Sequence, residues 1–392
     1  MFGIIKYFDC IGLTIVCLLQ LGCHAQSPKG NDVITGAQQL DLFLPQLADK
    51  SVALLVNHTS VVNQTHLLDT LLAGGIVVKT IFAPEHGFRG DLANGEKVLD
   101  GKDEKTGLPI VSLYGENKKP TAAQLDGIDI VVYDIQDVGT RFYTYISSMH
   151  YMMEACAENG IEFLILDRPN PNAHYTDGPV LEKGHASFVG IHPIPIVYGM
   201  TIGELAHMIK GEGWINQAEQ LQISVVKLKN WTYDTPYLLP IKPSPNLPNR
   251  LSIALYPSLC LFEGTNISVG RGTDFPFQII GYPSQEFGTF QFTPKSIPFT
   301  SKYPKHENQL CYGYDLRDSV PPTGLDLSFL IAYYKLAPDK NEYFNAFFTN
   351  LSGTSKLRQQ IENGLKEDEI KISWQKDLAL FKAKRQQYLL YK

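Results

Sequence analysis

The sequence predicts an α/β fold with a Rossmann-like, mostly parallel sheet, helices on both of its faces, and a smaller C-terminal α+β domain. Near-continuous runs of Val, Ile and Leu alternate with amphipathic segments through the first 230 or so residues, the pattern of a parallel sheet covered on both faces. Polar loops rich in Gly and Pro begin where three of these runs end. Such a sheet binds ligands beyond the carboxyl ends of its strands, so the three loops are expected to meet at one edge.

The individual elements follow from the period of the apolar residues and from the residues that bound each run. Strands, some with their exit loops, are expected in these segments: 51–58, 76–87, 108–115, 129–142, 161–172, the start of 194–215, and 222–231. Helices are expected in these: 36–49, 66–75, 121–128, 145–160 and the rest of 194–215. Segments 325–337 and 355–370 are examples of the separate strand and helix signals in the remainder of the chain. A glycine closes the helix at 66–75, and Thr121 is placed to cap the short helix that follows it.

Three segments divide the 392-residue chain: a signal peptide at 1–25, the Rossmann-like catalytic domain at 26–285, and the C-terminal domain at 286–392. Residues 11–22 form an apolar run too short to span a bilayer comfortably, as in an export signal. Cys23 would suit lipidation and Ala25 ordinary cleavage, and both remain open. The protein is therefore expected to be exported, periplasmic or lipid-anchored at the cell envelope, with membrane contact only through Cys23.

Composition excludes some classes of function. A net charge of −6 without a local Lys/Arg cluster argues against nucleic-acid binding. Neither GxGxxG after the first strand nor GxxxxGK[ST] occurs, so no nucleotide cofactor is expected, and no other cofactor is implied. Cys156, Cys260 and Cys311 are too far apart in sequence for a zinc motif. Buried free thiols are favoured over one disulfide bond.

The loop FAPEHGFRGD (82–91) is the leading candidate for chemistry, because it places Glu85, His86, Arg89 and Asp91 directly after a buried strand. A carboxyl group partly withdrawn from water holds its proton more strongly, which suits a general acid. His86 would orient Glu85 or bind a substrate hydroxyl. The plainer interpretation is a local Glu85–Arg89 ion pair. No HxH or HExxH spacing supports a metal site, and none is expected.

Two further loops carry polar side chains in the same setting. Asp134 and Gln136 face one side at the end of the strand in YDIQDVGTRFYTY (133–145), since strand side chains alternate. Arg141 would hold an anionic substrate group, because a guanidinium binds a carboxylate in a bidentate fork. Asp137 and Thr140 have turn formation as the stronger explanation. The DRPNPN loop adds Asn170, for which a rigid turn is an equal alternative.

The Gly-rich segment FEGTNISVGRGTDFPF (262–277) has many polar groups and little periodicity. It supplies Glu263, Asn266, Arg271 and Thr273 as candidate site residues, although its glycines equally permit ordinary turns. The full set of expected substrate-binding residues is His86, Arg89, Gln136, Arg141, Tyr143, Tyr145, Asn170, Asn266, Arg271 and Thr273.

Five motifs occur in order, FAPEHGFRGD, YDIQDVGTRFYTY, LDRPNP, PIVYGMTIGEL and FEGTNISVGRGTDFPFQIIG. Together they resemble those of the NamZ-type exo-β-N-acetylmuramidases, from about residue 33 to the C-terminus. The resemblance implies a cleft shared by the two domains and release of N-acetylmuramic acid from the non-reducing ends of peptidoglycan fragments. It places the acid at Glu85. The partners it implies are muropeptides, in cell wall recycling.

The second catalytic group stays open at this stage. Either the substrate's acetamido group attacks its own anomeric carbon, with Asp134 or Asp137 orienting the amide, or Asp134 or Glu263 activates water. A non-catalytic exported muropeptide- or sugar-binding protein is the main alternative, and a metal-dependent hydrolase is the second.

Overall fold

The computed structural model describes residues 33–88 and 100–391. The predicted signal peptide and Cys23, together with Arg89 and Asp91, lie outside the described residues. No helix within the described ranges is long and apolar enough to cross a lipid bilayer.

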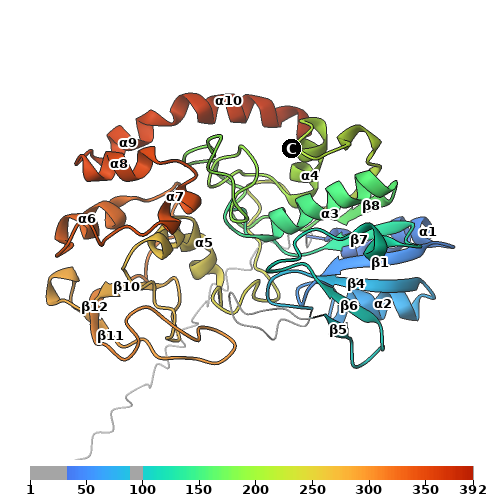
Figure 1. The fold of residues 1–392 in the computed structure, drawn as a ribbon, viewed down its shortest axis with the longest axis horizontal. Coiled ribbons are helices and arrows are strands. Elements are labelled where there is room, and N and C mark those ends of the chain that lie inside the picture. The colour runs from blue at the N-terminus through green and yellow to red at the C-terminus, as the bar shows by residue number, and fades with distance from the viewer. Residues whose placement is uncertain (1–32, 89–99, 392) are drawn as a thin grey trace, which may run out of the picture. The chain divides into compact units, whose positions relative to one another are not determined.

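A seven-stranded sheet forms the N-terminal part, in the order β5-β6-β4-β1-β7-β8-β9 (Figure 1). Every neighbouring pair is parallel except β5 with β6, which confirms the predicted α/β class. The strands are β1 (Ser51–Val56), β4 (Val77–Ala83), β5 (Gly101–Lys102), β6 (Pro109–Ser112), β7 (Ile130–Asp134), β8 (Glu162–Leu166) and β9 (Ile223–Val226). A short β2–β3 hairpin (Val61–Val62 and Thr65–His66) follows β1.

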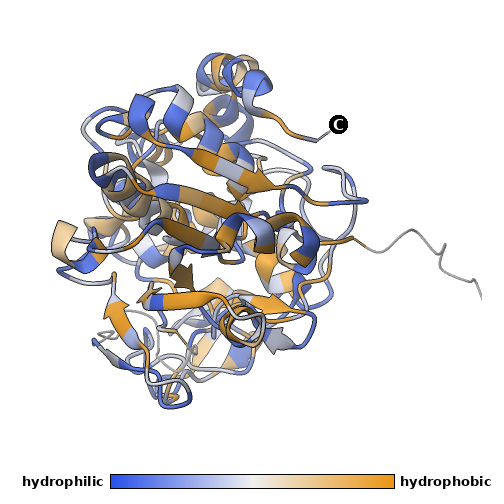
Figure 2. Ribbon diagram, turned by 90° about the vertical axis from the view of Figure 1, so that its right-hand side faces the viewer, coloured by the Kyte–Doolittle hydropathy of each residue, from blue (hydrophilic) through white to orange (hydrophobic). Residues whose placement is uncertain are grey.

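The strands are apolar on both sides because helices cover both faces. Val52, Leu54 and Val56 of β1 belong to one core cluster with Phe43 and Leu67, which come from α1 (Leu40–Leu47) and α2 (Leu67–Ala73). Alternate residues of the same strand belong to the other cluster, together with residues of α3 (Tyr145–Asn159) and α4 (Ile202–Gly211). The strands in Figure 2 are accordingly mostly hydrophobic.

One predicted strand is wrong. Residues 194–198 are buried and apolar, but they form no strand of the sheet. Val197 instead makes isolated bridges to Thr140 and Asp177, and the carbonyl of Ile196 accepts a hydrogen bond from the backbone N–H of Arg141. The run is therefore buried by packing across loops, which hydrophobicity alone does not distinguish from a sheet strand.

The C-terminal part has its own three-stranded antiparallel sheet, β10-β12-β11, formed by β10 (Ile279–Tyr282), β11 (Phe290–Phe292) and β12 (Cys311–Asp315). The helices of this part are α5 (Arg250–Leu259), α6 (Ser328–Leu336), α7 (Phe347–Ser352), α8 (Lys356–Glu362), α9 (Glu367–Ser373) and α10 (Gln375–Arg385). Cys156, Cys260 and Cys311 are buried free thiols, as favoured from the sequence.

The chain returns to the first domain at its end, where α10 leads back toward α4 (Figure 1). The Arg385 guanidinium donates to Thr176 Oγ1 at 2.8 Å and to the carbonyl of Gly199 at 2.7 Å. The Tyr391 hydroxyl donates to Asp167 Oδ2 at 2.5 Å. The last residues therefore fasten the C-terminal helices to the Rossmann-like domain.

A buried histidine pair gives a testable pH dependence of stability. His150 Nδ1 on α3 lies 3.1 Å from His192 Nε2. Burial lowers the pKa of His150 from 6.5 to about 4 and that of His192 well below its ordinary value. Below pH 6.5 the unfolded chain takes up protons that the folded chain does not, so folded stability falls as the pH falls toward 4.

For His150 alone the loss at pH 5 is about 2 kcal/mol relative to pH 7.5. Urea unfolding at the two pH values should therefore show a smaller pH-dependent loss for His150→Gln than for the parent. An equal loss in both proteins would contradict the assignment.

A candidate active site at the strand ends

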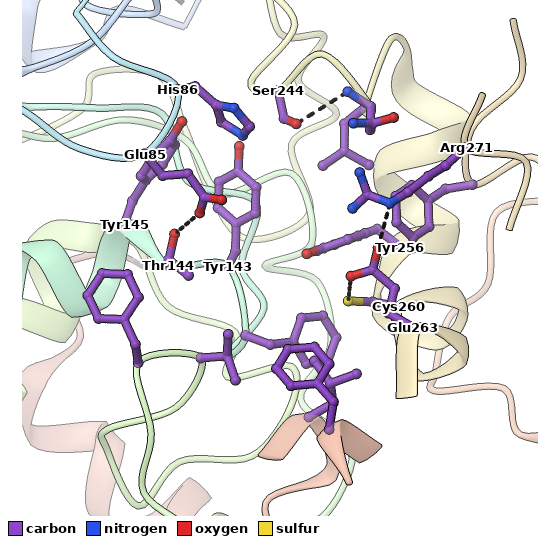
Figure 3. Close-up of a pocket in the computed structure, with 18 of the residues that line it drawn as sticks. Glu85, His86, Tyr143, Thr144, Tyr145, Ser244, Tyr256, Cys260, Glu263 and Arg271 are labelled. Carbon is purple, nitrogen blue, oxygen red and sulfur yellow. Dashed lines mark hydrogen bonds and ion pairs between the residues drawn. The ribbon is translucent and has the colours of Figure 1, made fainter. Parts of the chain in front are cut away.

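A cavity of about 270 Å³ lies where loops after β4, β6 and β7 meet the C-terminal domain (Figure 3). Two groups of polar side chains line it. Glu85, Tyr114, Thr144 and Tyr145 come from the Rossmann-like domain. Glu263 and Arg271 come from the segment after α5. The cavity thus joins the two domains, with a carboxyl group on each side.

Glu85 is fixed by a tight turn and by two hydroxyl groups. Its turn is closed by the N–H of Gly87, which donates to the carbonyl of Pro84 at 3.0 Å. Gly87 and His86 both have positive φ, +76° and +71°, a conformation in which glycine carries no Cβ penalty and a non-glycine residue such as histidine is strained. The Tyr114 hydroxyl donates to Glu85 Oε1 at 2.9 Å, and the Thr144 hydroxyl donates to Oε2 at 2.8 Å.

These hydroxyls come from two separate loops, since Tyr114 follows β6 and Thr144 directly precedes α3. Burial and the negative charge of Glu85 raise the pKa of Tyr114, so Tyr114 remains a donor. A threonine hydroxyl either donates or accepts. The arrangement can therefore hold Glu85 both as a carboxylate and with a proton directed at Thr144.

Tyrosine rings form the floor beside Glu85. Tyr143 packs edge-to-face on Tyr145 and on Tyr256, with ring centroids 4.9 and 6.0 Å apart. The Tyr143 hydroxyl donates to the carbonyl of Pro243 at 2.8 Å, which fixes the ring. Burial, together with the charge of Glu85, raises the pKa of Tyr145. Such rings offer apolar faces with polar edges, as sugar sites do.

The opposite side of the cavity carries an ion pair. Arg271 Nε donates to Glu263 Oε1 at 2.5 Å, and the two side chains are 18% and 21% exposed. The guanidinium also lies 5.1 Å from the ring centroid of Phe277. In the described part of the chain its two terminal nitrogens make no hydrogen bond, so they are available to a bidentate acceptor such as a carboxylate.

The structure brings six of the predicted site residues together on this cavity, namely Glu85, His86, Tyr143, Tyr145, Glu263 and Arg271. Six others lie elsewhere: Asp134, Gln136, Arg141, Asn170, Asn266 and Thr273. Arg89 lies outside the described residues.

Asp134 is held in a buried ion pair. Both of its oxygens accept from Arg168, at 2.5 Å from Nε and 2.8 Å from Nη2, and the side chains are 0% and 3% exposed. Asp134 is therefore paired with Arg168 and does not line the cavity, so the predicted catalytic part of Asp134 gains no support from this geometry. The reason is tertiary, since Arg168 follows a different strand.

Arg141 is likewise a structural residue in this fold. Its side chain is fully buried, and it donates to four backbone carbonyls, those of Pro179, Ile194, Leu351 and Ser352. Burial lowers its pKa to about 9. Arg141 does not line the cavity, so the prediction that it meets an anionic substrate group gains no support from this geometry.

Arg141 therefore links the Rossmann-like domain to the end of α7. Arg141→Met is expected to lower the free energy of unfolding by about 3–5 kcal/mol, because it strands four buried carbonyls. Urea denaturation measures this. Arg141→Lys is the control and should recover only part of the loss, since one ammonium makes fewer bonds than the guanidinium. A variant as stable as the parent would contradict the structural role.

The other predicted site residues that lie away from the cavity stabilise loops. Gln136 Nε2 donates to the carbonyls of Asp137 and Pro169 at 2.8 and 2.7 Å. Asn170 Nδ2 donates to the carbonyl of Met200 at 2.8 Å. Thr273 closes a turn onto Gly270 at 2.7 Å, so the turn interpretation is the better one for these loops.

Asn266 belongs to the turn that follows Glu263. Its backbone N–H donates to the carbonyl of Tyr343 at 3.0 Å, and its own carbonyl lies 2.5 Å from His306 Nε2. Its backbone therefore ties the turn to two other segments of the C-terminal domain.

Sequence reasoning missed Tyr114, Thr144, Ser244 and Tyr256, which also line the cavity. Tyr114 stands two residues after a strand end, and the rule that singled out Glu85 would have found it. Ser244 lies in a proline-rich connection with no signal of its own. Among the described residues no group of three or more His, Cys, Asp or Glu side chains is arranged to hold a metal ion.

Comparison with known proteins identifies the family. The N-terminal model of exo-β-N-acetylmuramidase NamZ matches residues 52–251, and the C-terminal model matches 254–391. A peptidoglycan β-N-acetylmuramidase NamZ of Bacillus subtilis strain 168 is 41% identical, over 93% of each chain.

Two crystal structures of DUF1343 family proteins from Bacteroides fragilis NCTC 9343 are also similar. Each match covers 92% of this chain and 99% of the other chain. They have TM-scores of 0.85 and 0.80 at 47% and 31% identity. Because both domain models match and the Bacillus subtilis relative is 41% identical over 93% of the chain, this chain belongs to the NamZ exo-β-N-acetylmuramidase family, and it is a glycosidase.

Proposed function

We propose that this enzyme removes N-acetylmuramic acid from the non-reducing ends of peptidoglycan fragments, with Glu85 as the general acid. The observation that carries the proposal is the pairing of two features across one cavity. A carboxyl group held by two hydroxyls faces an arginine with unused donors. The B. subtilis relative is named for activity on peptidoglycan.

Glu85 is suited to proton transfer by its position. It is 8% exposed, stands at a strand end and lines the cavity. In the first step the C1–O bond to the leaving sugar breaks while the Glu85 proton passes to the leaving oxygen. The resulting Glu85 carboxylate is then stabilised by the hydroxyls of Tyr114 and Thr144.

The group that attacks C1 is best supplied by the substrate. Glu263 lines the cavity, but its carboxylate is already bound to Arg271. Asp134 and Asp137 do not line the cavity. The acetamido oxygen would form the new bond to C1, giving a cyclic oxazolinium ion. Water would then open this ion, losing its proton to Glu85 and restoring the acid.

Arg271 gives the site a reason to prefer muramic acid. This sugar differs from N-acetylglucosamine by a lactyl ether that ends in a carboxylate, and a guanidinium binds a carboxylate through two parallel hydrogen bonds. The cavity of about 270 Å³ is slightly smaller than the usual range for small-molecule pockets, which begins at about 300 Å³. That size favours one terminal sugar over a continuous strand, as in an exo-acting enzyme.

The decisive experiment is incubation of the purified protein with the disaccharide of N-acetylmuramic acid linked to N-acetylglucosamine, followed by mass spectrometry. Release of free N-acetylmuramic acid supports the proposal. Tight binding without products would favour the muropeptide-binding alternative. A rate abolished by chelators and restored by added metal would favour the metal-dependent hydrolase.

Action at the cell envelope is part of the same proposal, because the substrate is there and the N-terminal sequence resembles an export signal. Fractionation of cells that produce the full chain tests this. Replacement of Cys23 by alanine distinguishes lipidation at Cys23 from ordinary signal-peptide cleavage at Ala25. A membrane-bound parent and a released variant would indicate lipidation, and identical fractionation would indicate ordinary cleavage.

A further inference from the structure

The turn that carries Glu263 is gathered around a single lysine. Lys305 Nζ donates to the carbonyls of Phe262 at 2.8 Å and Glu263 at 3.1 Å, to that of Thr265, and to that of Ile267 at 3.5 Å. An ammonium group has three N–H bonds, and here four carbonyls converge on it. The side chain comes from the connection between β11 and β12, about 40 residues away in sequence.

The same turn positions the ion pair of the active site. Glu263 lies inside the segment that Lys305 holds, and its carboxylate in turn fixes Arg271 Nε at 2.5 Å. A second cavity of about 310 Å³ shares Glu263, Arg271 and Phe347 with the first and is also lined by Lys302 and Lys305. Lys305 therefore lines a cavity that Glu263 and Arg271 also line.

We propose that Lys305 is a positioning residue, whose ammonium form shapes the Glu263 turn and so presents Arg271 to the carboxylate of the substrate. The inference rests on the proposed function of this site. Lys305 itself touches no substrate and acts through the carbonyls of residues 262–267. Four carbonyl dipoles pointing at one another repel, and a central positive charge offsets that repulsion.

The charge on Lys305 changes within an accessible pH range. Burial lowers the pKa of Lys305 to about 8. Around it, the charge of Glu263 and the thiol of Cys260 raise this pKa, whereas the positive charge of Arg271 lowers it. His306 is the next residue in the chain, and Lys302 lines the same cavity. Above pH 8 the neutral amine of Lys305 has one N–H donor fewer and no positive charge, so it holds the four carbonyls of the turn less strongly.

The test compares the full chain with three variants on a chromogenic N-acetylmuramide between pH 6.5 and 9.5. Lys305→Met should raise KM at pH 7 about tenfold, the worth of hydrogen bonds to a charged group. Its kcat should stay near that of the parent because Glu85 is untouched. Lys302→Met is the matched control, since it removes a charge from the same cavity without touching the carbonyls. Its KM should stay within about twofold of the parent.

The pH profile separates positioning from a merely structural role. The parent's KM should rise above pH 8 toward the pH-independent value of Lys305→Met. Lys305→Arg, which keeps its charge throughout, should abolish this rise. The inference is overturned if Lys305→Arg follows the parent's alkaline rise, or if Lys305→Met binds substrate as the parent does.

A second readout keeps the result separate from the proposed function. Calorimetric binding of free N-acetylmuramic acid is measured on the same proteins across the same pH range. Absent turnover, with binding that weakens above pH 8 in the parent and in Lys302→Met but not in Lys305→Arg, would refute the catalytic proposal and support the role of Lys305. Absence of both turnover and binding would refute both.

Discussion

Glu85→Gln is expected to lower kcat on the natural disaccharide by about 10²- to 10⁴-fold, the contribution of a positioned general acid. Glutamine keeps the shape of the side chain, and the hydroxyls of Tyr114 and Thr144 can still bond to it. The folded state should therefore survive. The measurement is the release of N-acetylmuramic acid, with thermal unfolding as the check on folding.

The leaving group sharpens this result. A nitrophenyl group departs without much need of a proton, whereas a sugar alkoxide does not. The loss caused by Glu85→Gln should accordingly be smaller on a nitrophenyl N-acetylmuramide than on the disaccharide. Near-parental turnover on both substrates would show that Glu85 is not the acid.

Two milder variants test how Glu85 is held. Tyr114→Phe and Thr144→Val each remove one hydrogen bond of 2.8–2.9 Å from the carboxyl group. Each should slow turnover by about tenfold, in keeping with a hydrogen bond to a charged group. Glu263→Gln is a useful contrast, because it leaves the acid intact and should act mainly through Arg271.

Arg271→Met is expected to lower kcat/KM on an N-acetylmuramide by roughly 100-fold, about 3 kcal/mol, since it removes the partner of the substrate carboxylate. The loss should be mainly in KM. The corresponding N-acetylglucosaminide lacks the lactyl group, so any residual activity on it should change much less. Equal losses on both sugars would contradict carboxylate recognition.

The loss must be separated from the effect of an unpaired Glu263. Arg271 and Glu263 form one ion pair, so removing the arginine alone leaves a partly buried carboxylate without its partner. The double variant Arg271→Met with Glu263→Gln removes that penalty. If the double variant regains parental kcat/KM, Arg271 serves the fold of the turn rather than the substrate. Arg271→Lys should retain part of the affinity through charge alone.

The local sequence was sufficient to locate one side of the site. Glu85 stands after a continuous apolar strand, within a Pro- and Gly-bounded turn, and the carboxyl ends of parallel strands share one edge. The same rule singles out Tyr143 and Tyr145, which also line the cavity. The rule singles out Asp134 as well, but Asp134 does not line the cavity. Arg168, at the end of the next strand, pairs with that carboxylate instead.

The sequence by itself determined the α/β class, the positions of most strands along the chain, and a glutamate at the end of one of them. These follow from apolar period and turn residues, which are local properties. Which arginine faces the cavity was decided only by the tertiary structure. Arg141 and Arg271 both follow a glycine within a few residues, so their neighbours in sequence do not distinguish them.

The difference arises from contacts distant in the chain. The carbonyls of Leu351 and Ser352, 210 and 211 residues beyond Arg141, converge on its guanidinium and bury it. Glu263 occupies only one nitrogen of Arg271 and leaves the others facing the cavity. A buried cation must find every partner inside the protein, whereas one at a cavity keeps donors for a ligand. That partition depends on how the two domains pack, and no local pattern encodes it.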